Sequence, residues 1–139
     1  MKILIIGANG FIAQHLIYSL SNKSWHSVIS IARSNLSNSL IDNSKFHLLD
    51  ITNSIEVKNV ITSYKPDVVL YLAALTLPNC CELNREDCYN INVHGTENVI
   101  AACKLINAYL LFASTDFVFS GEKGPYKEDD KVDPVNYMV

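Results

Sequence analysis

The sequence has no long apolar run and no excess of positive charge. No stretch approaches the ~18 apolar residues of a membrane-spanning helix. The apolar run that starts at Met1 ends at Ile6, too early for the apolar region of a signal peptide. The formal net charge is -3, so there is no basic stripe to neutralise nucleic-acid phosphates. We therefore expect a cytoplasmic protein that binds neither membranes nor nucleic acids.

Cysteine is present, but in a pattern that suits neither disulfides nor a metal. The four cysteines are Cys80, Cys81, Cys88 and Cys103. Adjacent Cys80 and Cys81 do not suit an ordinary disulfide framework, so we expect free thiols. The spacing of Cys81, Cys88 and His94 matches no zinc-binding pattern. The sequence therefore predicts no metal site.

The composition and the apolar pattern predict one α/β domain. Apolar residues make up 49% of the 139 residues and charged residues 18%, a balance typical of a folded domain with a real core. The expected strands are Lys2–Ile6, Val28–Ala32, Phe46–Leu49, Val68–Leu72 and Tyr109–Ala113. Helical periodicity covers Gly10–Leu20, a segment from Thr52 or Asn53 to Tyr64, and Asn84–Ile106. This alternation predicts a Rossmann-type, doubly wound parallel sheet of about five strands with flanking helices.

Two finer expectations concern segments between these strands. In the second helix, the apolar positions expected to be buried are Ile55, Val57, Val60 and Ile61. Residues 35–44 are rich in serine and asparagine without periodicity, which is typical of a surface loop.

A glycine-rich turn follows the first strand and opens the first helix. Gly7 permits a tight turn, and Gly10 lets backbone amides approach a pyrophosphate. In this strand-turn-helix context the segment predicts a dinucleotide site, although an ordinary glycine turn is the alternative. The residues of the turn predicted to bind the cofactor are Gly7, Asn9, Gly10, Phe11 and Ile12.

The end of the second strand favours one cofactor over the other. An acidic residue at this position binds the adenosine ribose 2′-hydroxyl and repels a 2′-phosphate. The segment from His26 to Leu36 has no Asp or Glu, and Arg33 and Ser34 follow the strand instead. Arg33 can form charge-assisted hydrogen bonds to a 2′-phosphate. NADP(H) is therefore favoured, NAD(H) is possible, and a merely solvated Arg33 is the alternative.

Two further strand ends are candidates for contact with the cofactor. Asp50 can accept a hydrogen bond from the adenine amino group while Ile51 packs on the ring, or Asp50 can cap the following helix. Leu72, Ala73 and Ala74 bring small side chains to a place where backbone must pass close to a cofactor, although small residues are common at strand ends.

The sequence carries an ordered set of motifs that extends beyond the glycine-rich turn. They are Gly7–Ile12, Leu72–Thr76, Asn92–Asn98 and Ser114–Gly121, extended by Gly124–Glu128 and Pro134–Asn136. Several motifs at suitable intervals are more specific than any single one. In these motifs the whole chain resembles the extended short-chain dehydrogenase/reductase superfamily, especially its dTDP-4-dehydrorhamnose reductase-like branch.

The resemblance implies binding of a nicotinamide dinucleotide and reduction of a 4-keto nucleotide-sugar. In that chemistry Thr115 polarises the carbonyl, a tyrosine delivers the proton, and Asn92 helps to place the nicotinamide side. Tyr137, about two dozen residues after Thr115, is the candidate tyrosine. Such a tyrosine needs a lysine one helical turn later to lower its pKa.

The end of the sequence departs from the branch's usual Pro-x-Asn-x-Tyr-Gly pattern. With Pro134 and Asn136 aligned, Tyr137 takes the variable position and Met138 the position of the catalytic tyrosine. Either Tyr137 replaces that tyrosine through a one-residue shift of register, or the catalytic tyrosine is missing and Tyr137 is an ordinary loop residue. The lysine, and the family's C-terminal half with most of the substrate pocket, lie outside the sequence. We therefore expect residues 1–139 to be a truncated NAD(P)-binding domain that is incomplete for catalysis.

Two other functions remain open. One is a non-catalytic regulatory or interaction subunit, as the reductase-like fold that accompanies methionine adenosyltransferase in this branch. The other is the cofactor half of a nucleotide-sugar epimerase or dehydratase. A parallel sheet without its last strands leaves an apolar edge, which favours a homo-oligomer or a partner subunit.

Overall fold

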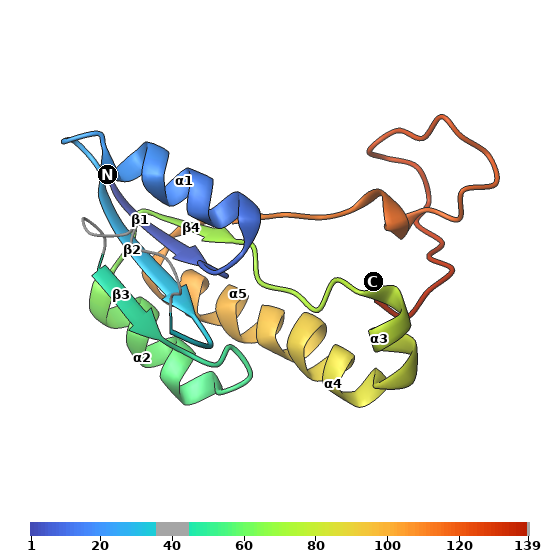
Figure 1. The fold of residues 1–139 in the computed structure, drawn as a ribbon, viewed down its shortest axis with the longest axis horizontal. Helices are drawn as coiled ribbons and strands as arrows, with labels where there is room; N and C mark the ends of the chain where they lie inside the picture. The colour runs from blue at the N-terminus through green and yellow to red at the C-terminus, as the bar shows by residue number, and fades with distance from the viewer. Residues whose placement is uncertain (36–44, 139) are drawn as a thin grey trace.

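A five-stranded parallel sheet organises the chain. The computed structural model describes residues 1–35 and 45–138, and its strand order is β3-β2-β1-β4-β5. The strands are β1 (Lys2–Ile6), β2 (Ser27–Ala32), β3 (Lys45–Leu48), β4 (Val68–Tyr71) and β5 (Tyr109–Phe112). Helices lie on both faces of the sheet (Figure 1). The prediction of a doubly wound α/β fold is confirmed. No observed strand end differs from its predicted position by more than one residue. The loop expected over residues 35–44 lies outside the described residues, except for Asn35.

The helices differ more from the prediction than the strands do. The helices α1 (Phe11–Ser21) and α2 (Ser54–Tyr64) lie where they were expected. The single helix expected over residues 84–106 is built from α4 (Arg85–Tyr89), a π-helical turn η2 (Asn90–His94) and α5 (Gly95–Ile106). A short helix α3 (Pro78–Leu83) was not predicted, because six residues are too few to establish a helical period. In the described part of the chain, no helix has the length and apolarity to cross a membrane.

The strand order places a switch point in the middle of the sheet. The chain runs outward from β1 through β2 to β3, and then returns to the other side of β1 to form β4 and β5. All four strand pairs are parallel, so the carboxyl ends of β1 and β4 lie side by side. In open α/β sheets of this kind, ligands bind outside the carboxyl ends of the strands at the switch point.

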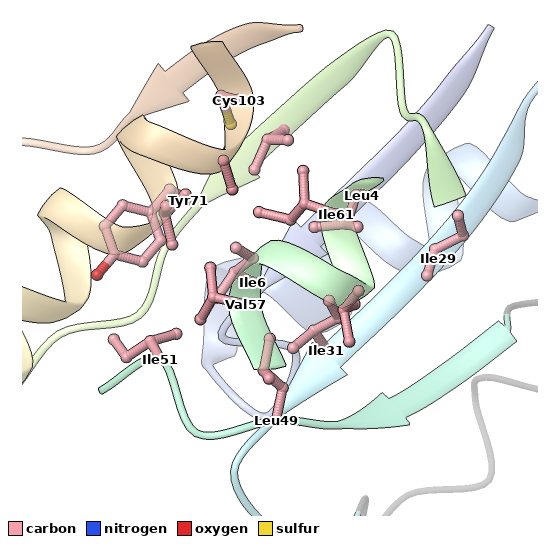
Figure 2. Packing of buried hydrophobic residues seen from close by; sticks show 14 residues of the cluster. Leu4, Ile6, Ile29, Ile31, Leu49, Ile51, Val57, Ile61, Tyr71 and Cys103 are labelled. Atoms are coloured by element: carbon pink, nitrogen blue, oxygen red, sulfur yellow. The ribbon is translucent and has the colours of Figure 1, made fainter. Parts of the chain in front are cut away.

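The core consists of two apolar layers, one on each face of the sheet. The larger layer packs β1, β2 and β4 against α2 and α5, and Figure 2 shows Leu4, Ile31, Ile61 and Tyr71 converging in it. The smaller layer lies under α1, which buries Ala13 and Ile17. Phe11 and Ile12, at the start of α1, are 81% and 61% exposed.

Helix α2 shows where the apolar pattern was right and where it was wrong. Its N-cap is Asn53, whose Oδ1 accepts a hydrogen bond from Glu56 N at 3.2 Å. Asn53 is one of the two residues at which the helix was expected to begin. Val57, Val60 and Ile61 are buried. Ile55 is 71% exposed, so its predicted burial is wrong: at 100° per residue it lies about 200° from Val57, on the opposite face of the helix.

This difference between two isoleucines of one helix can be measured. Ile61→Ala should lower the free energy of unfolding by about 2–5 kcal/mol, because a fully buried side chain leaves a cavity. Ile55→Ala is the matched control and should change it by less than about 0.5 kcal/mol. Urea unfolding followed by circular dichroism gives both values. Equal losses for the two variants would contradict the packing of α2 described here.

Candidate functional site

A cleft lies at the carboxyl edge of the sheet, at the switch point between β1 and β4. Its volume is about 280 Å³. Most of the residues predicted to bind a cofactor line it: Gly7, Asn9, Gly10, Arg33, Ser34, Asp50, Ile51, Leu72, Ala73 and Ala74. The side chains of Phe11, Ile12 and Asn92 do not line it. The fold therefore brings together predicted residues that lie up to 67 positions apart, from Gly7 to Ala74.

The turn after β1 depends on a glycine at position 7. Gly7 has φ +92°, and a Cβ built there would lie 2.8 Å from Ala73 N and 2.8 Å from Leu72 C. The amides of Gly7 and Ala8 both donate to Ile31 O at 2.9 Å. Position 7 is thus enclosed by the backbones that follow β4 and end β2. Any side chain would be strained by its φ and would also push these backbones apart.

Helix α1 starts at this cleft, and no side chain among the described residues caps its first backbone N–H groups. Gly10 is its N-cap and offers no side chain to cap the first turn. Gly10 N donates to Gly7 O at 2.9 Å, which closes the turn. The first N–H groups of a helix have no partner within the helix, and together with the helix dipole they favour an anion at that end.

The ends of β2 and β3 form the opposite wall of the cleft. Asp50 Oδ1 accepts hydrogen bonds from Thr52 N at 2.9 Å and from Thr52 Oγ1 at 2.8 Å. These bonds, and then the positive charge of Arg33, hold the pKa of the Asp50 carboxyl below its usual value. Asp50 therefore shapes the loop before α2, while Asn53 and not Asp50 provides the helix cap.

Two cleft loops are held by the side-chain amides of Asn92 and Asn98 in the long helical segment. The sequence did not predict this role for either residue. Asn98 Nδ2 donates to Ile51 O at 3.0 Å. Asn92 Oδ1 accepts from Leu75 N at 2.8 Å, and Asn92 Nδ2 donates to Leu75 O at 3.1 Å. Gly95 permits close packing, because a Cβ there would lie 2.8 Å from Ile51 Cδ1. The motif Asn92–Asn98 signalled these residues, but its spacing alone does not name their partners.

The two predicted catalytic residues lie outside the cleft lining. The segment after β5 leaves the sheet and returns to α3, as Figure 1 shows. Thr115 caps the short 3₁₀ helix η3 (Asp116–Val118): its Oγ1 accepts from Phe117 N at 3.3 Å and donates to Asp116 Oδ1 at 3.2 Å. Within the described residues, no hydrogen bond joins Thr115 to Tyr137.

Tyr137 and Met138 dock against α3, α4 and η2. Tyr137 N donates to Glu82 Oε1 at 2.7 Å, and the guanidinium of Arg85 lies 5.1 Å from the centre of the Tyr137 ring. Asn92 Nδ2 donates to Met138 O at 2.8 Å. Met138 is 8% exposed, in an apolar cluster with Cys81 and Cys88. Asn92 thus joins the loop after β4 to the segment that holds Tyr137.

All four cysteines are free thiols. Tyr137 and Met138, which we call the docked segment, cover one of them, Cys88. Burial, followed by the neighbouring Cys81 thiol and Glu82 carboxylate, raises the pKa of Cys88 to about 12. Cys88 Sγ donates to Tyr137 O at 3.6 Å. His94 is directed elsewhere, since its Nδ1 lies 3.1 Å from Glu97 Oε2.

The close approach at position 7 predicts a large cost for a small substitution. Gly7→Ala should lower the free energy of unfolding by about 1–3 kcal/mol more than Gly121→Ala. Gly121 is the matched control, because it has φ +83° but nothing within 4 Å of a Cβ. Urea unfolding of both variants tests this. Equal costs would mean that φ alone, and not the backbone after β4, requires glycine at position 7.

The docking of Met138 predicts the order in which the thiols react. At pH 8, iodoacetamide should modify Cys88 at least about tenfold more slowly than the partly exposed Cys80, because the Cys88 thiolate is scarce. Met138→Ala should speed the reaction of Cys88 and leave that of buried Cys103 unchanged. Peptide mass spectrometry measures the rates. An unchanged rate of Cys88 modification in Met138→Ala would contradict the conclusion that Met138 shields Cys88 from solvent.

Comparisons with known proteins agree with this architecture. The RmlD substrate binding domain family matches residues 1–138. A dTDP-4-dehydrorhamnose reductase of Aggregatibacter actinomycetemcomitans is 33% identical over 135 residues, which are 96% of this chain and 42% of that protein. Methionine adenosyltransferase 2 subunit beta of Xenopus tropicalis is 30% identical over 135 residues, 97% of this chain and 38% of that protein.

A solved structure gives the same result in three dimensions. The crystal structure of a hypothetical dTDP-4-dehydrorhamnose reductase from Sulfolobus tokodaii has a TM-score of 0.85 and 34% identity, and the match covers 99% of this chain and 48% of that one. The chain thus spans less than half the length of these relatives. By its family match and its fold, the chain belongs to the RmlD substrate binding domain family and is similar to dTDP-4-dehydrorhamnose reductases, as its motifs predicted.

Proposed function

We propose that the cleft binds a nicotinamide dinucleotide, with NADP(H) preferred to NAD(H). The observation that carries this proposal is the turn at Gly7 and Gly10, which opens α1 at the switch point of the sheet. Gly10 adds no side chain at the helix N-terminus, so the cofactor's pyrophosphate can approach the first backbone amides. The residues fit the group because the backbone of Gly7 and Gly10 and the guanidinium-bearing Arg33 all line the cleft, as a phosphorylated ligand requires.

The remaining cleft residues fit the two ends of the cofactor. Arg33 and Ser34 lie at the end of β2, where the adenosine ribose is held in this kind of fold. Asp50 and Ile51 form the adjacent wall, suited to adenine. Residues Leu72, Ala73 and Ala74 offer their backbone to the nicotinamide end, and the two alanines add only small side chains. Asn92 acts indirectly through its two hydrogen bonds to Leu75.

For the complete protein, we propose reduction of a 4-keto nucleotide-sugar. The bound cofactor would supply the hydride. Thr115 Oγ1 would donate a hydrogen bond to the substrate carbonyl instead of to Asp116, and Tyr137 would supply the proton after a one-residue change of register. Support comes from the relatives named as dTDP-4-dehydrorhamnose reductases. The relatives extend well beyond the part that this chain spans, and in this proposal that further part completes the substrate pocket.

A second candidate function is favoured by the docked segment. Met138, which the motif Pro-x-Asn-x-Tyr-Gly aligns with the catalytic tyrosine, is buried, and the Tyr137 ring packs under Arg85. Such an arrangement suits a non-catalytic subunit that keeps the fold and binds a partner protein. The similarity to methionine adenosyltransferase 2 subunit beta supports this candidate. Cofactor binding is common to both candidates, whereas turnover of a keto-sugar by the complete protein would eliminate the second.

The cofactor proposal is tested by binding. The chain should bind NADPH more tightly than NADH in isothermal titration calorimetry. Arg33→Gln should weaken NADPH binding by about 10- to 100-fold, because it removes hydrogen bonds to a charged phosphate, and should change NADH binding little. Arg85→Gln is the matched control, since Arg85 pairs with Glu82 away from the cleft. If neither NADPH nor NADH bound at millimolar concentration, the proposal would be refuted.

A further inference from the structure

One side chain of the glycine-rich turn spans to the end of β2. Asn9 Nδ2 donates to Ser34 O at 3.0 Å and to Ser34 Oγ at 2.9 Å. Asn9 O in turn accepts from Gln14 Nε2 at 3.0 Å, which ties the turn to the first part of α1. Asn9 and Ser34 both line the cleft. The two walls that would enclose the pyrophosphate and the adenosine ribose are therefore joined by one amide group.

Chemistry determines which way this amide faces. A backbone carbonyl oxygen can only accept hydrogen bonds, so the atom of Asn9 that faces Ser34 O must be the donor Nδ2. The rotated amide would bring Oδ1 against that carbonyl. In the observed orientation, Asn9 Oδ1 is buried and has no partner among the described residues. The orientation that lets Asn9 Nδ2 donate to Ser34 therefore leaves the acceptor Asn9 Oδ1 without a hydrogen bond within the described part of the chain.

The orientation of Asn9 sets the hydrogen-bonding role of Ser34. The Ser34 Oγ lone pair accepts from Asn9, so the hydroxyl proton is directed away from Asn9. Ser34 is exposed and lies beside the guanidinium of Arg33 at the cleft. The end of β2 thus presents hydrogen-bond donors, and residues 26–36 contain no acidic side chain to accept from a hydroxyl.

We propose that Asn9 is a specificity-determining positioning residue: by donating to Ser34, it makes the Ser34 hydroxyl a donor that, with Arg33, selects a ribose 2′-phosphate over a 2′-hydroxyl. A phosphate has only acceptors to offer, so it gains from both donors. A hydroxyl gains less, because it is uncharged and cannot pair with the Arg33 guanidinium as a phosphate does, and because residues 26–36 hold no carboxylate to accept its proton. This inference rests on the proposed function, since it names the feature of a dinucleotide that the cleft distinguishes.

The test compares ligands that differ only in the 2′-phosphate. Affinities for NADPH and NADH, and for adenosine 2′,5′-bisphosphate and AMP, are measured by calorimetry at one salt concentration. Asn9→Ala should reduce the preference for the 2′-phosphorylated ligand of each pair by about 3- to 10-fold, the size of one hydrogen bond. NADH and AMP affinities should fall by a smaller factor than the affinities for NADPH and adenosine 2′,5′-bisphosphate. Asn9→Asp should reduce the preference further, because the new carboxylate would accept the Ser34 proton.

A double-mutant cycle separates positioning from a general structural effect. Ser34→Ala should reproduce the loss of preference, and adding Asn9→Ala to it should cause no further loss, because Asn9 acts through Ser34. Ser34 is exposed, so Ser34→Ala keeps the test valid if Asn9→Ala fails to fold. Equal weakening of both ligands of a pair, or additive losses in the cycle, would overturn the role of Asn9 and leave the proposed function intact. Absence of binding to the unmodified chain would overturn both.

Discussion

The architecture of the cleft depends on the close approach of two backbones at the switch point of the sheet. Gly7, at φ +92°, passes so near Ala73 that a Cβ would lie 2.8 Å from its amide nitrogen. This contact lets β1 turn directly into α1 while β4 ends beside it. The start of α1, the end of β2 and the loop after β4 can then face one another. A side chain at position 7 would separate these three segments.

The helical segment behind the cleft holds its loops by hydrogen bonds to backbone. Asn98 binds Ile51 O, and Asn92 binds both backbone groups of Leu75. Each amide satisfies polar backbone groups in a loop that has no strand to pair with. The irregular segments of the site are therefore fixed by side chains of α5 and η2, and the cleft has the same supports whichever of the proposed functions the complete protein performs.

The docked segment extends this support beyond the cleft. Asn92 also donates to Met138 O, and Glu82 accepts from Tyr137 N at 2.7 Å. The hydrogen bond from Arg85, and then that from Tyr137 N, lower the pKa of the Glu82 carboxyl, so Glu82 is an anion at neutral pH. One asparagine thus connects the loop beside the proposed nicotinamide site with the segment that holds the candidate proton donor. Leu75 also packs directly against the cluster of Cys81, Cys88 and Met138, so the two places are in contact by more than this one side chain.

Local sequence determined those features whose physical cause is itself local. Short apolar runs required buried parallel strands, the glycines after β1 required a turn that other residues resist, and Asn53 capped α2 by reaching only three residues ahead. The residues at the cleft could be predicted because strand ends in this topology meet at one edge. Apolarity alone did not reveal that Ile55 faces solvent, because that depends on its angular position, about 200° from buried Val57 around the helix axis.

Only the tertiary structure decided the partners of Asn92, which lie 17 and 46 residues away, and the burial of Met138 among cysteines of α3 and α4. Only it joined Asn9 to Ser34 across 25 residues. A side-chain amide can bond any suitable group that the fold brings within about 3 Å. The sequence by itself thus determined which chemical groups are available at the cleft, and the packing of distant segments decided which of them meet.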